Sequence, residues 1–108
     1  MVIAEIRLRA LPEKQREFVQ TIHDLVGLTL NAKGCLGCRF YQDLDAKDVF
    51  AIVEKWDKRK NLENYLRSDN FSILLGTRTL LREPHDIEFN TASILPTDEV
   101  IRAARREC

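Results

Sequence analysis

The chain has 108 residues, 44% of them hydrophobic, which suffices for one compact core and is too little for two. Its 17 basic and 17 acidic side chains cancel, so no net field draws it to nucleic acid or to an anionic membrane. Residues 1–7 carry charges where a signal peptide needs an apolar run, and no apolar stretch is long enough to span a bilayer. We therefore expect one cytoplasmic domain over residues 1–108, with residues 96–108 as a short helical tail.

Residues 2–9 alternate between an apolar side and a mostly charged side, which is the pattern of a strand with one buried face. Pro12 suits the first turn of a helix, and apolar side chains then recur at helical spacing. Gly34 suits a left-handed cap after this helix, which we place at residues 12–31. His23 lies at the margin of the apolar stripe, where it either contacts a substrate pocket or is partly solvated.

Residues 35–44 and 48–57 are two β-rich runs joined by a short polar connection, as in an antiparallel hairpin. The register that this connection favours places Arg39 opposite Glu54, on the same face as Trp56. Both faces of the hairpin then carry mainly apolar side chains. Because both faces are apolar, we expect protein to cover the second face of the hairpin as well as the first.

The remainder of the chain completes a recognisable order of elements. Apolar spacing predicts a short helix at residues 62–66 and a further helical segment at residues 71–81, with a last strand at residues 85–95. The order β-α-β-β-α-β defines a ferredoxin-like α+β fold, in which the helices cover one face of a four-stranded antiparallel sheet. The other face would be bare in a monomer, so we expect a homodimer that pairs through its sheet faces.

Cys35 and Cys38 form a CxxC motif, but they lie on a predicted strand and not at a helix N-terminus, where a thiolate is stabilised. Positions i and i+3 of a regular strand point to opposite faces, so we do not expect these two thiols to meet. A zinc site needs a second pair of ligands, which Cys108 and two scattered histidines do not supply. The motif therefore predicts reduced, structural thiols and no bound metal.

Three sequence segments carry a family resemblance. They read Gly-Cys-Leu-Gly-Cys-Arg-Phe-Tyr-Gln-Asp from residue 34, Phe-Ala-Ile-Val-Glu-Lys-Trp up to Trp56, and Asn-Leu-Glu-Asn-Tyr-Leu-Arg-Ser-Asp-Asn-Phe over residues 61–71. In this order and spacing the chain resembles the antibiotic biosynthesis monooxygenase domain, over most of residues 1–95. The resemblance implies a dimeric α+β barrel with a pocket in each subunit between sheet and helices. For many members it also implies oxidation of quinols or polyphenols by dioxygen, with no metal or flavin cofactor.

The chain departs from the family at several polar positions. Where haem-degrading relatives of the superfamily use Asn, Trp and His, the matching residues here are Ile6, Trp56 and Leu75, and leucine cannot ligate haem iron. Many quinol-oxidising members carry His before the phenylalanine that matches Phe71, where this chain has Asn70. An amide binds a substrate hydroxyl by hydrogen bonds, but it cannot take its proton at neutral pH.

The leading functional hypothesis is a cofactor-independent monooxygenase acting on a small phenolic or quinol compound with dioxygen. In it, Trp56 stacks on the ring, Glu54 accepts a proton because burial raises its pKa, and Asn70 donates a hydrogen bond to the substrate. In the alternative, Glu54 pairs with Arg39 and stays ionised, and Asn70 only caps a helix. The other pocket candidates are His23, Arg39, Tyr65, Phe71 and Leu75. Two further functions stay open: an isomerase or degradative enzyme for a small signalling compound, and a non-catalytic ligand-binding dimer.

Overall fold

The computed structural model describes residues 1–106. In chain order its elements are β1 (Val2–Arg9), the 3-10 turn η1 (Pro12–Lys14), α1 (Gln15–Thr29), β2 (Cys35–Gln42), β3 (Val49–Trp56), α2 (Arg59–Leu66), α3 (Asp69–Gly76), the 3-10 turn η2 (Thr77–Leu80), β4 (Asp86–Thr91) and α4 (Thr97–Arg106). The four strands form one antiparallel sheet in the order β2-β3-β1-β4. This is the ferredoxin-like order, so the predicted fold class is confirmed.

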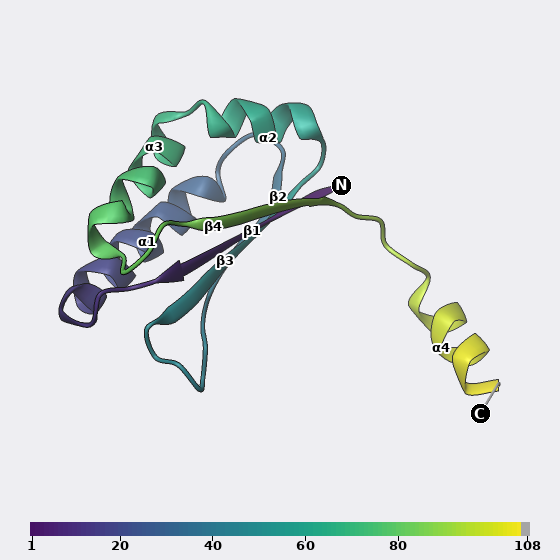
Figure 1. The fold of residues 1–108 in the computed structure, drawn as a ribbon. Coiled ribbons are helices and arrows are strands. Elements are labelled where there is room, and N and C mark those ends of the chain that lie inside the picture. The colour runs from purple at the N-terminus through teal and green to yellow at the C-terminus, as the bar shows by residue number, and fades with distance from the viewer. Residues whose placement is uncertain (107–108) are drawn as a thin grey trace.

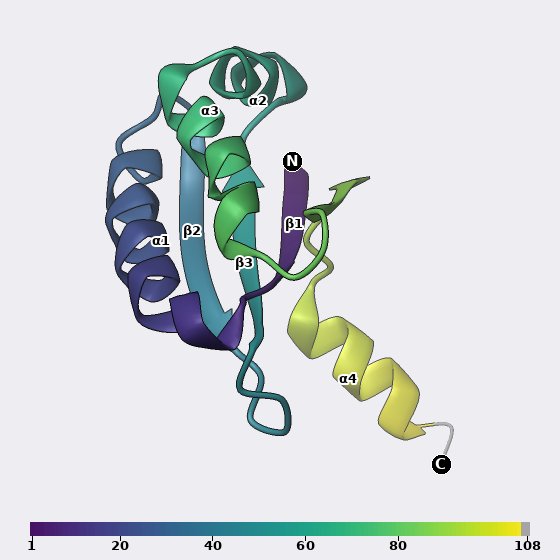
Figure 2. The same ribbon diagram turned by 60° about the vertical axis from the view of Figure 1, so that its left-hand side comes forward.

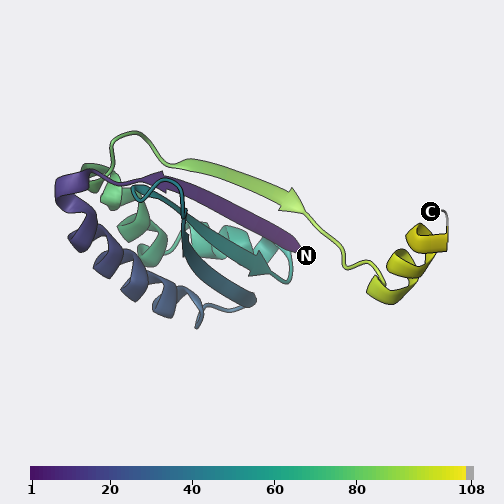
Figure 3. The same cartoon turned by 90° about the horizontal axis from the view of Figure 1, so that it is seen from below.

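The helices α1, α2 and α3 lie on one side of the sheet, which is clearest when the molecule is seen from below (Figures 1 and 3). On the opposite side, no described segment covers the sheet. The alternation in β1 turns Ala4, Ile6 and Leu8 inward, where each is at most 2% exposed. Ile6 and Leu8 pack with the apolar stripe of α1, including Phe18, whose ring centroid lies 5.0 Å from that of Phe50.

A second, smaller core cluster lies at the other end of the sheet. Trp56 ends β3 and is completely buried, together with Leu62 and Tyr65 of α2. Burying a large apolar side chain contributes about 1.5–3 kcal/mol to folding. The α2 helix is therefore fixed on the sheet mainly through its contacts with Trp56.

The predicted register of the hairpin is wrong. Glu54 pairs with Cys38, and Arg39 pairs with the residue before Glu54. The strand β2 ends earlier than expected, at Gln42, because the Asp43 carboxylate accepts a backbone hydrogen bond from Asp45 at 2.7 Å and turns the chain. As a result, Arg39 and Glu54 lie on opposite faces of the sheet.

The prediction that Cys35 and Cys38 point to opposite faces of the strand is also wrong, because a β-bulge lies between Cys35 and Gly37. Cys35 pairs with Trp56 and Cys38 pairs with Glu54, and both partners face the helices. The extra residue of the bulge therefore places both thiols on the same face and not on opposite faces. Both are free, and burial raises the pKa of Cys38 to about 12 and also raises that of Cys35. The remaining cysteine of the sequence, Cys108, lies outside the described residues.

Gly34 does adopt the predicted left-handed conformation, with φ +84°. However, α1 ends at Thr29, so Gly34 ends the loop before β2 and is not the helix cap itself. The last strand also ends earlier than expected, at Thr91. The predicted second helical segment consists of α3 followed by η2.

The open face of the sheet is mixed, so the prediction of two largely apolar faces is only partly right. Val49, Ala51 and Val53 line its middle and are half-buried. Charged side chains flank them, including Arg7 of β1 and Arg39 of β2, which are both exposed. Dimerisation through this face stays a prediction.

The helix α4 stands away from the rest of the molecule (Figures 1 and 2). It has no buried residue, and residues 92–96 connect it to β4. The described part of the chain measures 52 × 35 × 20 Å along its principal axes. Within residues 1–106, no helix has both the length and the apolar character that a membrane crossing requires.

Candidate active site

Glu54 is the most unusual polar residue of the core, with only 2% of its surface exposed. It lies two residues before Trp56 on β3, so both side chains point toward the helices. The Trp56 indole Nε1 donates a hydrogen bond to Glu54 Oε1 at 3.1 Å. In the described part of the chain, Glu54 has no ion-pair partner.

Burial raises the pKa of Glu54 above its ordinary value, because a carboxylate is poorly solvated in the core. Hydrogen bonds from Trp56 and Tyr65 act in the opposite direction and are the smaller effect. The predicted pairing of Glu54 with Arg39 is wrong, since Arg39 lies on the other face of the sheet. Glu54 is therefore a buried carboxyl group held by neutral donors.

Tyr65 of α2 connects this carboxyl group to α1. Its ring packs on Trp56, with 4.9 Å between ring centroids, and Phe71 packs on its edge at 5.7 Å. Thr29 Oγ1 donates to the carbonyl of Leu25 at 2.9 Å and lies 3.3 Å from the Tyr65 hydroxyl. Burial and the nearby Glu54 raise the pKa of Tyr65, which keeps it a proton donor.

Two clefts flank the Trp56 cluster. The α2–β4 cleft has a volume of about 370 Å³ and is lined by Val2, Arg59, Leu62, Glu63, Leu66, Phe89, Asn90 and Thr91. Val2, Leu62 and Leu66 also pack in the Trp56 cluster. A single layer of apolar side chains therefore separates this cleft from Trp56.

The second cleft is smaller, about 190 Å³, and lies on the other side of α2. Its lining brings together two predicted site residues, Tyr65 and Asn70. Ser68, and not Asn70, caps α3, because its Oγ accepts a hydrogen bond from the backbone N–H of Phe71 at 3.3 Å. The alternative in which Asn70 caps the helix is therefore wrong.

Three other predicted pocket residues lie away from these clefts. His23 is on the solvent side of α1 with its side chain 80% exposed, and Arg39 is on the open face of the sheet. Leu75 is 47% exposed, whereas its neighbour Leu74 is completely buried. The helix phase set by the Ser68 cap turns Leu74, and not Leu75, toward the core.

Thr29 and Cys38 belong to the site but were not among the predicted site residues. Thr29 lies on the same stripe of α1 as the buried residues Phe18, Ile22 and Leu25, which is the signal that marks it as buried. Cys38 lies beside Glu54, whose charge further raises the pKa of the thiol. Among residues 1–106, no three His, Cys, Asp or Glu side chains lie close enough to hold a metal ion together.

The fold and the site define a ferredoxin-like α+β domain with a carboxyl–aromatic cluster between its sheet and helices. The chain belongs to the antibiotic biosynthesis monooxygenase family, whose sequence profile matches residues 1–72. The resemblance inferred from the sequence is thus confirmed. No curated protein matches this sequence closely enough to count as a relative.

Solved structures show the same fold. A conserved protein from Methanosarcina mazei is 25% identical with a TM-score of 0.79, and the match covers 86% of this chain and 94% of that one. A candidate antibiotic biosynthesis monooxygenase from Deinococcus radiodurans is 23% identical with a TM-score of 0.81, covering 88% and 95% of the two chains. Rv0793 from Mycobacterium tuberculosis is 16% identical with a TM-score of 0.80, covering 88% and 97%.

Proposed function

We propose that this chain binds a small phenolic or quinol compound in the α2–β4 cleft and oxidises it with dioxygen, without a metal or flavin. Family membership supports a monooxygenase. The cleft volume of about 370 Å³ lies within the usual range for small-molecule sites, about 300–1,000 Å³. The apolar lining by Val2, Leu62 and Leu66 suits an aromatic ring.

The buried carboxyl group of Glu54 is the observation that carries this proposal. Oxygenation without a cofactor requires the substrate to donate electrons to dioxygen, which is easiest from a phenolate. A carboxyl group with a raised pKa, and with no cationic partner within residues 1–106, is suited to accept the phenolic proton. The Trp56 N–H holds this group in one orientation.

The substrate reaches Glu54 when the side chains of Leu62 and Leu66 turn aside. Both belong to α2, which has eight residues and whose N-cap residue, Lys58, makes no side-chain capping bond. Such a helix is held by its packing and not by its own stability, because short isolated helices are marginal in water. Movement of α2 is therefore the step that joins the cleft to the Trp56 cluster.

The reaction balances without another reductant. Hydroquinone and dioxygen give hydroxybenzoquinone and water: one oxygen atom is inserted into a ring C–H bond as a hydroxyl group, the O–O bond breaks, and the other oxygen leaves as water with the two protons of the quinol hydroxyl groups. All four electrons come from the quinol. Glu54 takes the proton of one hydroxyl group and returns it to the departing oxygen.

The proposal includes a homodimer that pairs through the open faces of the two sheets. Val49, Ala51 and Val53 supply its apolar centre, and Tyr41, 55% exposed, lies on the same face. An apolar strip flanked by charges suits a self-complementary contact. Sedimentation as a monomer at micromolar concentration would exclude this arrangement.

A second candidate function is a non-catalytic ligand-binding protein. The burial of Trp56, at 0% exposed, favours it, because a sealed tryptophan cannot contact a substrate unless α2 moves. The third possibility, an isomerase or degradative enzyme, would show product formation without oxygen consumption.

Oxygen uptake with hydroquinone tests the proposed function. We expect uptake in the native protein, and about a 100-fold or greater loss in Glu54→Gln, since general-base catalysis contributes about 10²–10⁴-fold. Glu17→Gln is the matched control, because Glu17 is an exposed carboxylate on α1 and its loss should leave the rate unchanged. Quenching of Trp56 fluorescence without oxygen uptake would instead identify a binding protein.

A further inference from the structure

The helix α4 has an exposed apolar side. Val100 and Ile101 are 45% and 50% exposed, and Ala104 follows one turn later on the same side. A helix of ten residues is marginal in water by itself, so α4 needs packing to be stable. The described part of its own chain buries neither Val100 nor Ile101, so that packing has to come from another molecule.

The charged residues of α4 are sorted around this apolar side. Asp98 and Arg105 are both surface neighbours of Ile101, because residues three and four positions apart are adjacent on a helix. Since they are seven residues apart, almost two full turns, they form one row along the apolar side. The other charged residues of the described helix lie on the opposite side, and they are Glu99, Arg102 and Arg106. Within residues 1–106, none of these five side chains forms an ion pair.

A second copy of α4 has the surface that complements this row. In an antiparallel pair with a two-fold axis beside Ile101, Asp98 of each helix lies opposite Arg105 of the other, because these residues are three and four positions from Ile101. A parallel pair would place Asp98 beside Asp98 and Arg105 beside Arg105, which is unfavourable. The antiparallel pair therefore makes the charged row self-complementary.

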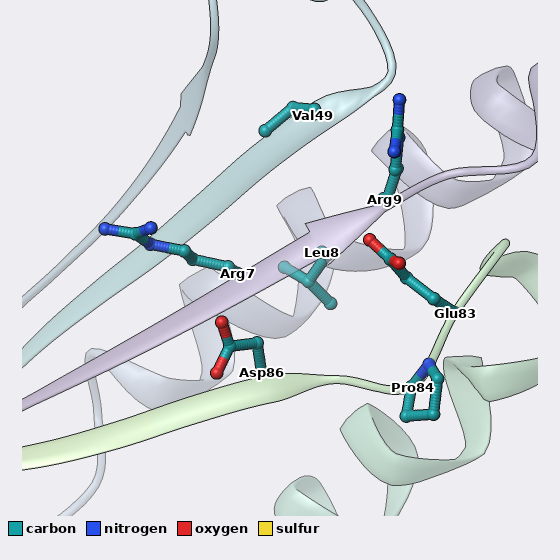
Figure 4. A pocket seen from close by; sticks show the side chains of 7 residues that line it. All are labelled: Arg7, Leu8, Arg9, Val49, Glu83, Pro84 and Asp86. Carbon is teal, nitrogen blue, oxygen red and sulfur yellow. The ribbon is translucent and has the colours of Figure 1, made fainter.

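The β1–β4 cleft is a poorer partner for α4. It is lined by Arg7, Leu8, Arg9, Val49, Glu83, Pro84 and Asp86. Figure 4 shows Glu83 and Asp86 on the β4 side of this cleft and Arg7 and Arg9 on the β1 side, so the two signs of charge balance. Arg7, Val49 and Asp86 also belong to the open face of the sheet, which the proposed sheet pairing would cover.

The two helices can reach each other in a dimer that pairs through its sheet faces. Ala92 donates a backbone hydrogen bond to the carbonyl of Met1 at 2.8 Å, which continues the line of β4 past the end of the sheet (Figure 3). Residues 92–96 and the helix together span about 30 Å. Packed sheets lie about 10 Å apart, and four strands measure about 15 Å across. Two arms of this length therefore bridge the distance between the sheet edges.

We infer that the α4 helices of two copies of this chain pair in an antiparallel arrangement. Ile101 of each copy lies at the two-fold axis, and Val100 packs beside it. Asp98 forms an ion pair with Arg105 of the other copy at each end. Two ten-residue helices bury too little surface for a stable dimer by themselves, so the pair adds to the proposed sheet contact. The contact does not depend on the oxygenase chemistry.

Disulfide trapping in the full-length chain tests this pairing. In a Cys108→Ser background, Ile101→Cys places one new thiol near the proposed axis. We expect a covalent homodimer on mild oxidation, and little from the Cys108→Ser protein alone, which controls for reaction of Cys35 and Cys38. Absence of the covalent dimer would overturn the inference, and so would an internal disulfide, which would show that the arm folds back on its own chain.

Charge reversal tests the antiparallel register. In the Ile101→Cys protein, Asp98→Arg or Arg105→Asp should each slow dimer formation about fivefold or more at low ionic strength, because two attractive pairs become repulsive. A chain with both reversals should regain the original rate. A mixture of the two single variants, combined under reducing conditions and then oxidised, should form the heterodimer at a similar rate. Since each chain in the mixture is unchanged, an effect on helix stability alone cannot restore the rate.

Arg106→Asp is the matched control, because it makes the same charge change on the opposite side of α4 and should leave the rate unchanged. Equal slowing by Arg105→Asp and Arg106→Asp, or no recovery in the mixture, would overturn the antiparallel contact. Binding to vesicles of anionic lipid without a covalent dimer would instead assign α4 to a membrane surface. Val53→Glu, on the open face of the sheet, separates this contact from sheet pairing: it should slow all the charge variants alike and preserve their order.

Discussion

Gly34→Ala should destabilise the protein well beyond the effect of a methyl group on an exposed loop. Gly34 has φ +84°, a conformation that costs an L-residue about 1–2 kcal/mol. An added Cβ would also lie closer than 3.0 Å to side-chain atoms of Asp57 and Asn61. These two side chains form a hydrogen bond of 2.9 Å, and Asn61 is only 4% exposed.

The added Cβ therefore displaces a hydrogen bond worth about 0.5–1.5 kcal/mol as well as straining the backbone. Together the two effects predict a loss of about 1.5–3.5 kcal/mol in the free energy of unfolding. This is a large share of the stability of a small domain, which is about 5–15 kcal/mol. Urea denaturation followed by Trp56 fluorescence measures it, because Trp56 is the sole tryptophan.

Gly27→Ala is the matched control. Gly27 lies within α1, and an added Cβ there would have no heavy atom within 4 Å. Alanine in a helix is favoured over glycine by about 0.5–1 kcal/mol, so this variant should be slightly more stable than the native protein. A Gly34→Ala loss below about 1 kcal/mol would refute the argument that Gly34 is required at this position.

Two further predictions concern the site. The raised pKa of Glu54 means that the folded state holds this proton more tightly than the unfolded state does. The stability of the native protein should therefore fall as the pH rises from 4.5 through the folded pKa of Glu54. Glu54→Gln should remove this part of the pH dependence, which thermal unfolding across a pH series measures. A native profile as flat as that of Glu54→Gln would contradict the burial argument. Leu74→Ala should lose about 2–5 kcal/mol in urea denaturation, whereas Leu75→Ala should lose less than about 1 kcal/mol; equal losses would show that the phase of α3 is misassigned.

The overall fold follows from the sequence because burial is encoded directly in local periodicity. Every second residue of β1 is apolar from Val2 to Leu8, and the inward residues of α1 recur at helical spacing. These patterns do not depend on distant contacts. The strands, the helices on one face and the separate tail helix could therefore be predicted from the sequence.

The register of the hairpin could not be predicted from local periodicity in the same way. It depends on the Asp43 side chain, which accepts backbone hydrogen bonds from Asp45 and Ala46 and so shortens β2. A change of one position moves a side chain to the other face of a sheet. This explains why Arg39 was wrongly placed beside Glu54.

The candidate site was predictable where it follows from one strand and not where it needs several elements. Glu54 and Trp56 share a face because they are two residues apart, and that relation is confirmed. The contribution of Thr29 depends on how α1 packs against α2, which the sequence does not specify. The exposure of His23 likewise depends on the rotation of α1 about its axis.

The β-bulge also affects how the cysteine motif should be compared between proteins. Leu36 is 61% exposed, and its neighbours Cys35 and Gly37 pair with adjacent residues of β3. Deleting Leu36 would therefore shorten the chain by one residue and leave every other pair of the hairpin in place. In three dimensions the motif is a Cys-x-Cys with one inserted residue, so an alignment that counts spacing alone would group this strand with redox-active loops that it does not resemble.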